Sequence, residues 1–202
     1  MHVDSETVMS RATAEEFQGL ELRCHSLLND VPVHDVWVVD LPGGGSGRTM
    51  RDVDALVARG HMTSGSRAVR ALFALRFLLG RVFRWDGPRH APLTASYLNR
   101  LTDDDRARSL VAPGTVRGPF RTLYLLPHEA LAEAHNATVH AFLASALVPR
   151  DGGYTLYWAV YVKPGGLATR LYMALIDPFR RRIVYPGMIR EMRAAWVRTY
   201  PR

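Results

Sequence analysis

The chain has 202 residues, of which 48% are hydrophobic, and a formal net charge of +7, which suits one domain with a sizeable core. The lone Cys24 excludes an internal disulfide, and no Cys or His spacing suits a zinc site, so we expect neither a metal nor another cofactor. The acidic N-terminus is unlike a signal peptide and no apolar run has membrane-spanning length, so we expect a cytoplasmic protein without stable membrane insertion.

The positive charge by itself does not indicate a nucleic-acid partner. Nearly all of it is arginine, and Lys163 is the single lysine. No RNP, helix-turn-helix or zinc-finger pattern accompanies it. We therefore expect no nucleic acid among the partners.

The first third of the chain predicts helices around one strand. Residues 13–29 have apolar residues at helical spacing, so we interpret residues 1–33 as an N-terminal extension with an amphipathic helix and residues 34–202 as a single domain. Residues 34–41 read as a strand, and the glycine-rich segment 43–47 as a flexible connector, since it lacks the Gly-Lys-Ser/Thr ending of a phosphate-binding loop. Two helices should follow, one capped by Thr49 and one over residues 66–85.

The second half predicts an antiparallel meander. After an irregular segment with short helices near residues 97–101 and 103–105, strands are expected at residues 120–126, 130–135, 138–148 and 154–163. In the last strand, alternation places Trp158 on one face and Tyr157 and Tyr161 on the other. Helical periodicity returns over residues 171–196, where Pro178 and Pro186 should kink or split the helix. This order predicts an α+β fold with helices packed against one sheet.

Particular residues resemble a known family. Residues 68–80 and 172–184, together with Asp35 and Gly118-Pro119-Phe120, resemble motifs of the bacterial domain-of-unknown-function family two-eight-six-seven. Arg180 stands where that family usually has a histidine. The family is similar to the START-like (SRPBCC) helix-grip superfamily, which includes lipid-binding domains and polyketide cyclases. The resemblance implies an antiparallel sheet wrapped around a long C-terminal helix, with a cavity between them.

Our leading functional hypothesis is a binder of a small apolar or aromatic molecule in that cavity. The candidate ligand-binding residues are Trp158, Phe142, Leu175, Trp85 and Tyr157. The alternative is a cofactor-independent enzyme of the cyclase or dehydratase type, in which His140 moves a proton and Tyr124 and Tyr161 donate hydrogen bonds. His140 also has a purely structural interpretation, which we favour. A homodimeric interaction protein without a ligand is the second alternative.

Overall fold

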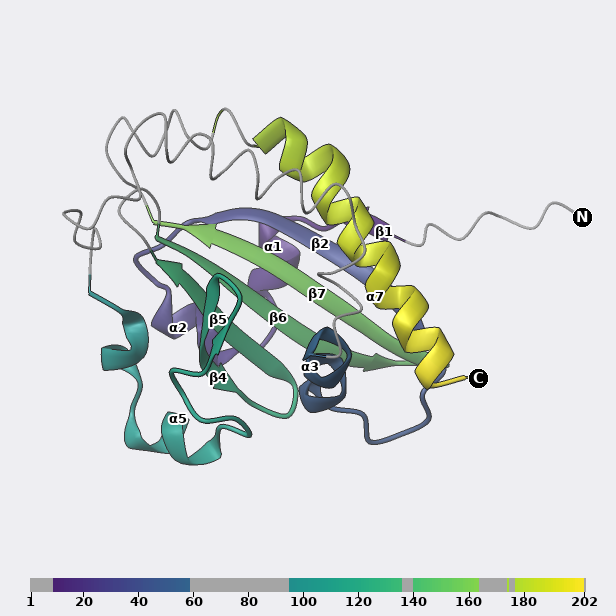
Figure 1. Ribbon diagram of the computed structural model, residues 1–202, viewed down its shortest axis with the longest axis horizontal. Helices are drawn as coiled ribbons and strands as arrows, with labels where there is room; N and C mark the ends of the chain where they lie inside the picture. The colour runs from purple at the N-terminus through teal and green to yellow at the C-terminus, as the bar shows by residue number, and fades with distance from the viewer. Residues whose placement is uncertain (1–8, 59–94, 136–139, 164–173, 175–176, 202) are drawn as a thin grey trace, which may run out of the picture.

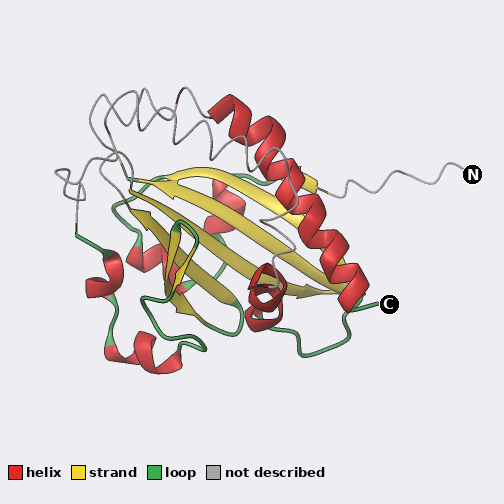
Figure 2. Cartoon of the chain, viewed as in Figure 1, coloured by secondary structure: helices red, strands yellow, loops and turns green. Residues whose placement is uncertain are grey.

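Seven antiparallel strands form one open sheet in the computed structural model, which describes residues 9–58, 95–135, 140–163, 174 and 177–201 (Figures 1 and 2). The strand order is β1-β2-β7-β6-β5-β4-β3. The strands are β1 (Met9–Arg11), β2 (Val33–Pro42), β3 (Val116–Arg117), β4 (Phe120–Leu125), β5 (Glu129–His135), β6 (His140–Arg150) and β7 (Gly153–Val162).

The predicted meander is confirmed for β4 to β7, each strand pairing with the next in sequence. Asp151 and Gly152 form the two-residue turn of the β6–β7 hairpin, and Gly152 has a φ of 75°, which such a turn needs. Pairing of β2 with β7 brings the first predicted strand beside the last. The sequence did not predict β1, which has only three residues and is defined by its pairing with β2.

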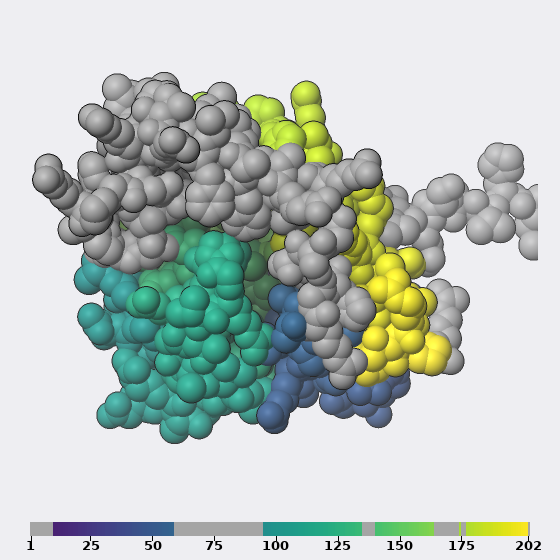
Figure 3. Space-filling view, viewed as in Figure 1, coloured from purple at the N-terminus to yellow at the C-terminus, as the bar shows by residue number. Residues whose placement is uncertain are grey.

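One face of the sheet packs against the C-terminal helix α7 (Tyr185–Thr199) and the shorter helix α3 (Met50–Ala58). Figure 1 shows α7 running across β2 and β7, and Figure 3 shows the yellow surface of the C-terminal helix near the blue surface of the segment that contains α3. Alternate strand residues such as Val39, Leu41 and Leu156 join Ile189 and Trp196 in this core. The predicted α+β helix-grip arrangement is therefore confirmed.

The C-terminal helix changes its winding between the two prolines. A π-helical turn η2 (Arg180–Val184) precedes α7, and the Tyr185 N–H donates to the Arg180 carbonyl oxygen. Pro186 has no N–H for the usual i to i−4 bond, so a wider turn just before it is physically reasonable. The sequence predicts a kink or a split at the prolines; the helix is not split between Asp177 and Thr199, and the π-helical turn is the irregularity seen there. Most of residues 164–176 lie outside the described residues.

The opposite face of the sheet is covered by the helices α1 (Ala14–Gln18) and α2 (Arg23–Leu27) and by the 3-10 helix η1 (Tyr97–Arg100). The helix predicted over residues 13–29 is thus two short helices, because α1 ends at Gly19 and α2 begins after Leu22. Helix α5 (Asp103–Arg108) follows η1, as expected from the acidic run. The helix predicted at residues 66–85 lies outside the described residues. Within the described part of the chain, no helix is long and apolar enough to cross a membrane.

Candidate functional site

Two tryptophans and a tyrosine form the centre of the interface between the sheet and the C-terminal helix. Trp37 of β2 and Trp158 of β7 are paired directly across neighbouring strands, so their side chains lie on the same face. The ring centroid of Tyr185, in the first turn of α7, lies 5.6 Å from that of Trp37 and 6.4 Å from that of Trp158. These distances are typical of aromatic pairs. The three rings therefore hold the start of α7 on the sheet.

The indole N–H groups of both tryptophans lack a hydrogen-bond partner within the part of the chain that the structure describes. Trp37 is 6% exposed and Trp158 is 8% exposed, and both Nε1 atoms are buried. A buried donor without an acceptor costs about 1–3 kcal/mol, so most native donors are paired. Trp196 follows that rule, because its Nε1 donates to the Pro42 carbonyl oxygen at 3.2 Å. The two donors without a partner among the described residues mark a place where a further acceptor would be favourable.

Small side chains adjoin this aromatic centre on the next two strands. Ser145 of β6 pairs with Trp158, and Ala130 of β5 pairs with Ser145. Five residues of β5 and β6 on this face are small and half-buried, namely Ala130, Ala132, Ala134, Ala141 and Ser145, whereas Leu143 and Leu147 of β6 belong to the helix-side core. The opposite face of the same strands carries the larger, fully buried Glu133, His140 and Phe142. The helix side of the sheet is therefore the more open one beside Trp158.

A buried cluster of ion pairs lies at the start of the C-terminal helix. The fully buried Asp35 carboxylate lies 2.9 Å from the Arg11 guanidinium, 3.0 Å from that of Arg181 and 3.3 Å from that of Arg180. Arg180 also donates to Asp177 at 2.8 Å. Asp35 and the segment 177–181 belong to two of the motifs that resemble the known family, and these two motifs are far apart in the sequence. The structure brings both motifs together and gives them a shared structural role.

Arg180 connects this ion-pair cluster to the aromatic centre. Its guanidinium carbon lies 5.2 Å from the centroid of the Tyr185 ring. Its Nη2 atom is bonded to the two carboxylates, whereas its Nε atom is buried and has no hydrogen-bond partner among the described residues. A third unpartnered donor therefore lies near the same tyrosine as the two indoles.

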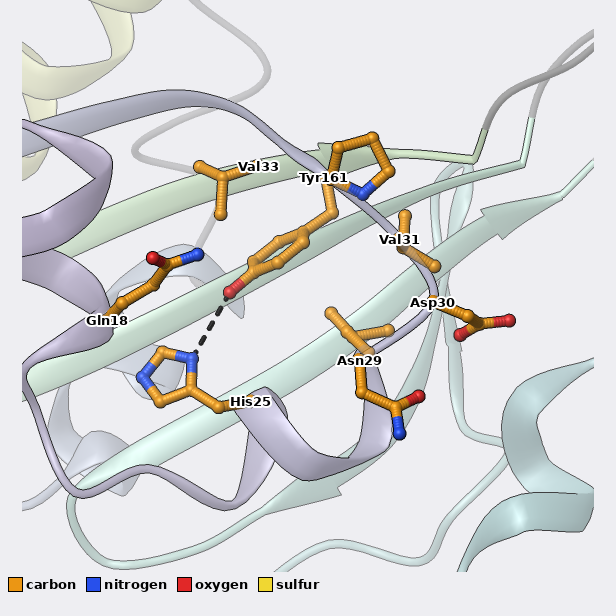
Figure 4. Close-up of a pocket in the computed structure, with 9 residues that line it drawn as sticks. Gln18, His25, Asn29, Asp30, Val31, Val33 and Tyr161 are labelled. Atoms are coloured by element: carbon orange, nitrogen blue, oxygen red, sulfur yellow. Dashed lines mark hydrogen bonds between the residues drawn. The ribbon is translucent and has the colours of Figure 1, made fainter.

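The opposite face bears an open pocket of about 600 Å³ between α1, α2, the segment 28–33 and Tyr161 (Figure 4). The Tyr161 hydroxyl lies 3.4 Å from Nδ1 of His25. Burial, reinforced by the nearby Cys24 thiol, raises the pKa of Tyr161 well above its ordinary value. Tyr161 therefore keeps its proton at neutral pH and can donate a hydrogen bond. It does so on the side of the N-terminal helices.

His140 belongs to a buried hydrogen-bond network on this second face. Its Nε2 lies 3.1 Å from the Glu133 carboxylate, which also accepts bonds from the Ser96 hydroxyl and the Tyr97 N–H. Burial raises the pKa of Glu133, but the hydrogen bonds from these donors have the larger effect, and the pKa lies below its ordinary value. A charged Glu133 can only accept, so Nε2 of His140 carries the proton. This geometry agrees with the structural interpretation of His140.

The other predicted site residues divide between the two faces. The Phe142 ring lies tilted against that of Tyr97 with 4.5 Å between ring centroids, Tyr124 is fully buried, and the Tyr157 hydroxyl donates to Glu16 at 2.8 Å. All three lie on the side of the N-terminal helices, with Tyr161 and His140.

Of the predicted site residues that are described, Trp158 alone faces the C-terminal helix. Leu175 and Trp85 lie outside the described residues. Sequence reasoning did not single out Trp37 or the Nε donor of Arg180. Among described side chains, no group of three or more His, Cys, Asp or Glu could hold a metal ion.

Comparison with known proteins shows the family of the chain. A family model described as "Protein of unknown function (DUF2867)" matches residues 27–187. The match includes the aromatic centre and every member of the ion-pair cluster except Arg11, and it confirms the resemblance found in the motifs. A search of curated proteins found no match. Since the family model covers most of the sequence, including strands β2 to β7 and the start of the C-terminal helix, the chain belongs to the DUF2867 family.

Proposed function

We propose that the protein binds a small apolar or aromatic molecule between the sheet and the C-terminal helix. The observation that carries this proposal is the pair of buried, unpartnered N–H donors of Trp37 and Trp158. A hydrogen bond from each donor to a ligand acceptor would contribute about 0.5–1.5 kcal/mol. Sites for small molecules typically combine an apolar lining with a few polar anchors, which is the combination offered here.

The side chains beside the indoles support this location. Ala130, Ala132 and Ser145 present little volume on the helix side, and they are only half-buried although they lie in the middle of a sheet. A molecule placed against them would cover apolar surface, which contributes about 25 cal/mol per Å². Shape and apolar contact would thus supply most of the affinity, and the indoles would fix the orientation.

The enzymatic alternative lacks a comparable observation. His140 lies on the opposite face of the sheet from Trp158 and bonds to Glu133. A cyclase or dehydratase acting beside Trp158 would therefore need a different group to move a proton. For the homodimer alternative, the chain itself covers the outer face of the sheet with α1, α2 and η1, and Phe17 of α1 is fully buried there.

The first experiment is native mass spectrometry of the protein purified from its own host, followed by identification of any small molecule released on denaturation. We expect one apolar or aromatic molecule per chain. The double variant Trp37→Phe/Trp158→Phe keeps aromatic rings but removes both donors. Losing two hydrogen bonds of about 1 kcal/mol each should lower affinity for the released molecule at least about tenfold.

Trp196→Phe is the matched control, because it removes an indole donor that already has a partner within the chain. We expect this variant to lose stability but to keep the affinity of the wild-type protein. The proposal is wrong if the wild-type protein carries no small molecule, or if the double variant binds as tightly as the control.

A further inference from the structure

The unpartnered groups around Tyr185 share one chemical property. Nε1 of Trp37, Nε1 of Trp158 and Nε of Arg180 are all buried N–H donors. None of these groups can accept a hydrogen bond. A ligand that satisfies them must therefore present an acceptor, and an alcohol or amine hydrogen would add nothing here.

The charge of the neighbouring cluster indicates which acceptor is preferred. Three guanidinium groups face two carboxylates, and the members are Arg11, Arg180, Arg181, Asp35 and Asp177. Among the described residues of this cluster, one positive charge is left unbalanced. Arg180 has the least exposed side chain of the three arginines, at 11%, so its charge is screened least by water.

We propose that the molecule bound beside Tyr185 is a carboxylic acid whose carboxylate accepts hydrogen bonds from Arg180 Nε and from the two indoles. This inference rests on the function proposed above. A carboxylate has two oxygens with about four lone-pair sites, which is enough for three donors. Its single charge matches the single excess positive charge, whereas a phosphate dianion would leave negative charge buried without compensation. A bond from a charged donor is also stronger than a neutral one.

The test compares the molecules carried by four proteins purified from the host: the wild type, Arg180→Gln, Arg180→Lys and Arg190→Gln. The Arg190 side chain is exposed on α7, away from the cluster, so this control makes the same change of charge. We expect a carboxylic acid at full occupancy in the wild type and in Arg190→Gln. In Arg180→Gln the affinity for that acid should fall at least about tenfold. Arg180→Lys keeps the charge without the Nε donor, and it should show a smaller loss even if Arg180→Gln folds poorly.

The outcomes separate this inference from the function on which it rests. A neutral molecule in the wild-type protein overturns the acid but leaves small-molecule binding intact. The same acid bound equally by the wild type, Arg180→Gln and Arg180→Lys overturns the role of Arg180. An empty wild-type protein overturns both the proposed function and the acid.

Discussion

Asp35→Asn should be among the most destabilising isosteric changes in this protein. The Asp35 side chain is fully buried, and its oxygens lie within 3.3 Å of three guanidinium groups. Removing one partner of a buried ion pair typically costs about 3–5 kcal/mol, because the other charge stays buried. Arg180 keeps Asp177 as a partner, and the other two arginines are partly exposed, so we expect about 3 kcal/mol. For a chain of this size that loss lowers the melting temperature by about 6–12 °C.

Urea unfolding followed by circular dichroism measures this loss directly. Arg11→Gln is the control, because it removes an ion pair of the same Asp35 whose basic side chain is 56% exposed. An exposed pair contributes about 0–1 kcal/mol. If Asp35→Asn loses no more stability than Arg11→Gln, the ion-pair cluster does not hold the C-terminal helix on the sheet.

Three further predictions concern other parts of the fold. Gly44 and Gly45 both have positive φ, so an alanine strains the backbone at either position. A Cβ at Gly44 would also lie 3.0 Å from the Trp196 ring, whereas one at Gly45 would meet nothing within 4 Å. The melting temperature of Gly44→Ala should therefore be lower than that of Gly45→Ala. Hydrogen bonds from its donors lower the pKa of Glu133 by more than burial raises it, so the stability that Glu133 contributes is lost as the pH falls through this lowered pKa. Urea unfolding between about pH 6 and about pH 3 should therefore show the wild type losing more stability than Glu133→Gln. Burial also raises the pKa of the Cys24 thiol, so a thiol-reactive dye at neutral pH should label it only after unfolding; rapid labelling of the folded chain would contradict its burial.

The sequence predicts the strands well where local chemistry determines them. Strands β4 to β7 combine alternating side chains with turn residues such as Asp151 and Gly152, and both signals are local. Strand β1 has three residues, too few to show a period, and only its partner β2 defines it. The apolar spacing continues across the break between α1 and α2, so only Gly19, where α1 ends, signals that break in the sequence.

The candidate site was harder to predict because alternation gives two faces without saying what covers each. In β7 the pattern separates Trp158 from Tyr157 and Tyr161 correctly. It does not say that the C-terminal helix covers the Trp158 face, so the predicted site residues came from both sides. Trp37 could be found only through its pairing with Trp158, which is a contact between residues far apart in the sequence.

Arg180 gives the helix contact and the proposed ligand contact a common origin. Its Nη2 bonds to Asp35 and Asp177 and so fixes the guanidinium near Tyr185, while its Nε makes no bond to either carboxylate. Asp35→Asn should therefore weaken ligand binding as well as folding, because Nε loses part of its orientation. Ligand stabilises a folded protein in proportion to the logarithm of its concentration over its dissociation constant. At a fixed concentration of the released molecule, the rise in melting temperature that this ligand causes should thus be smaller for Asp35→Asn than for Arg11→Gln. Equal rises in the two variants would show that the ion-pair cluster holds the helix without positioning a ligand.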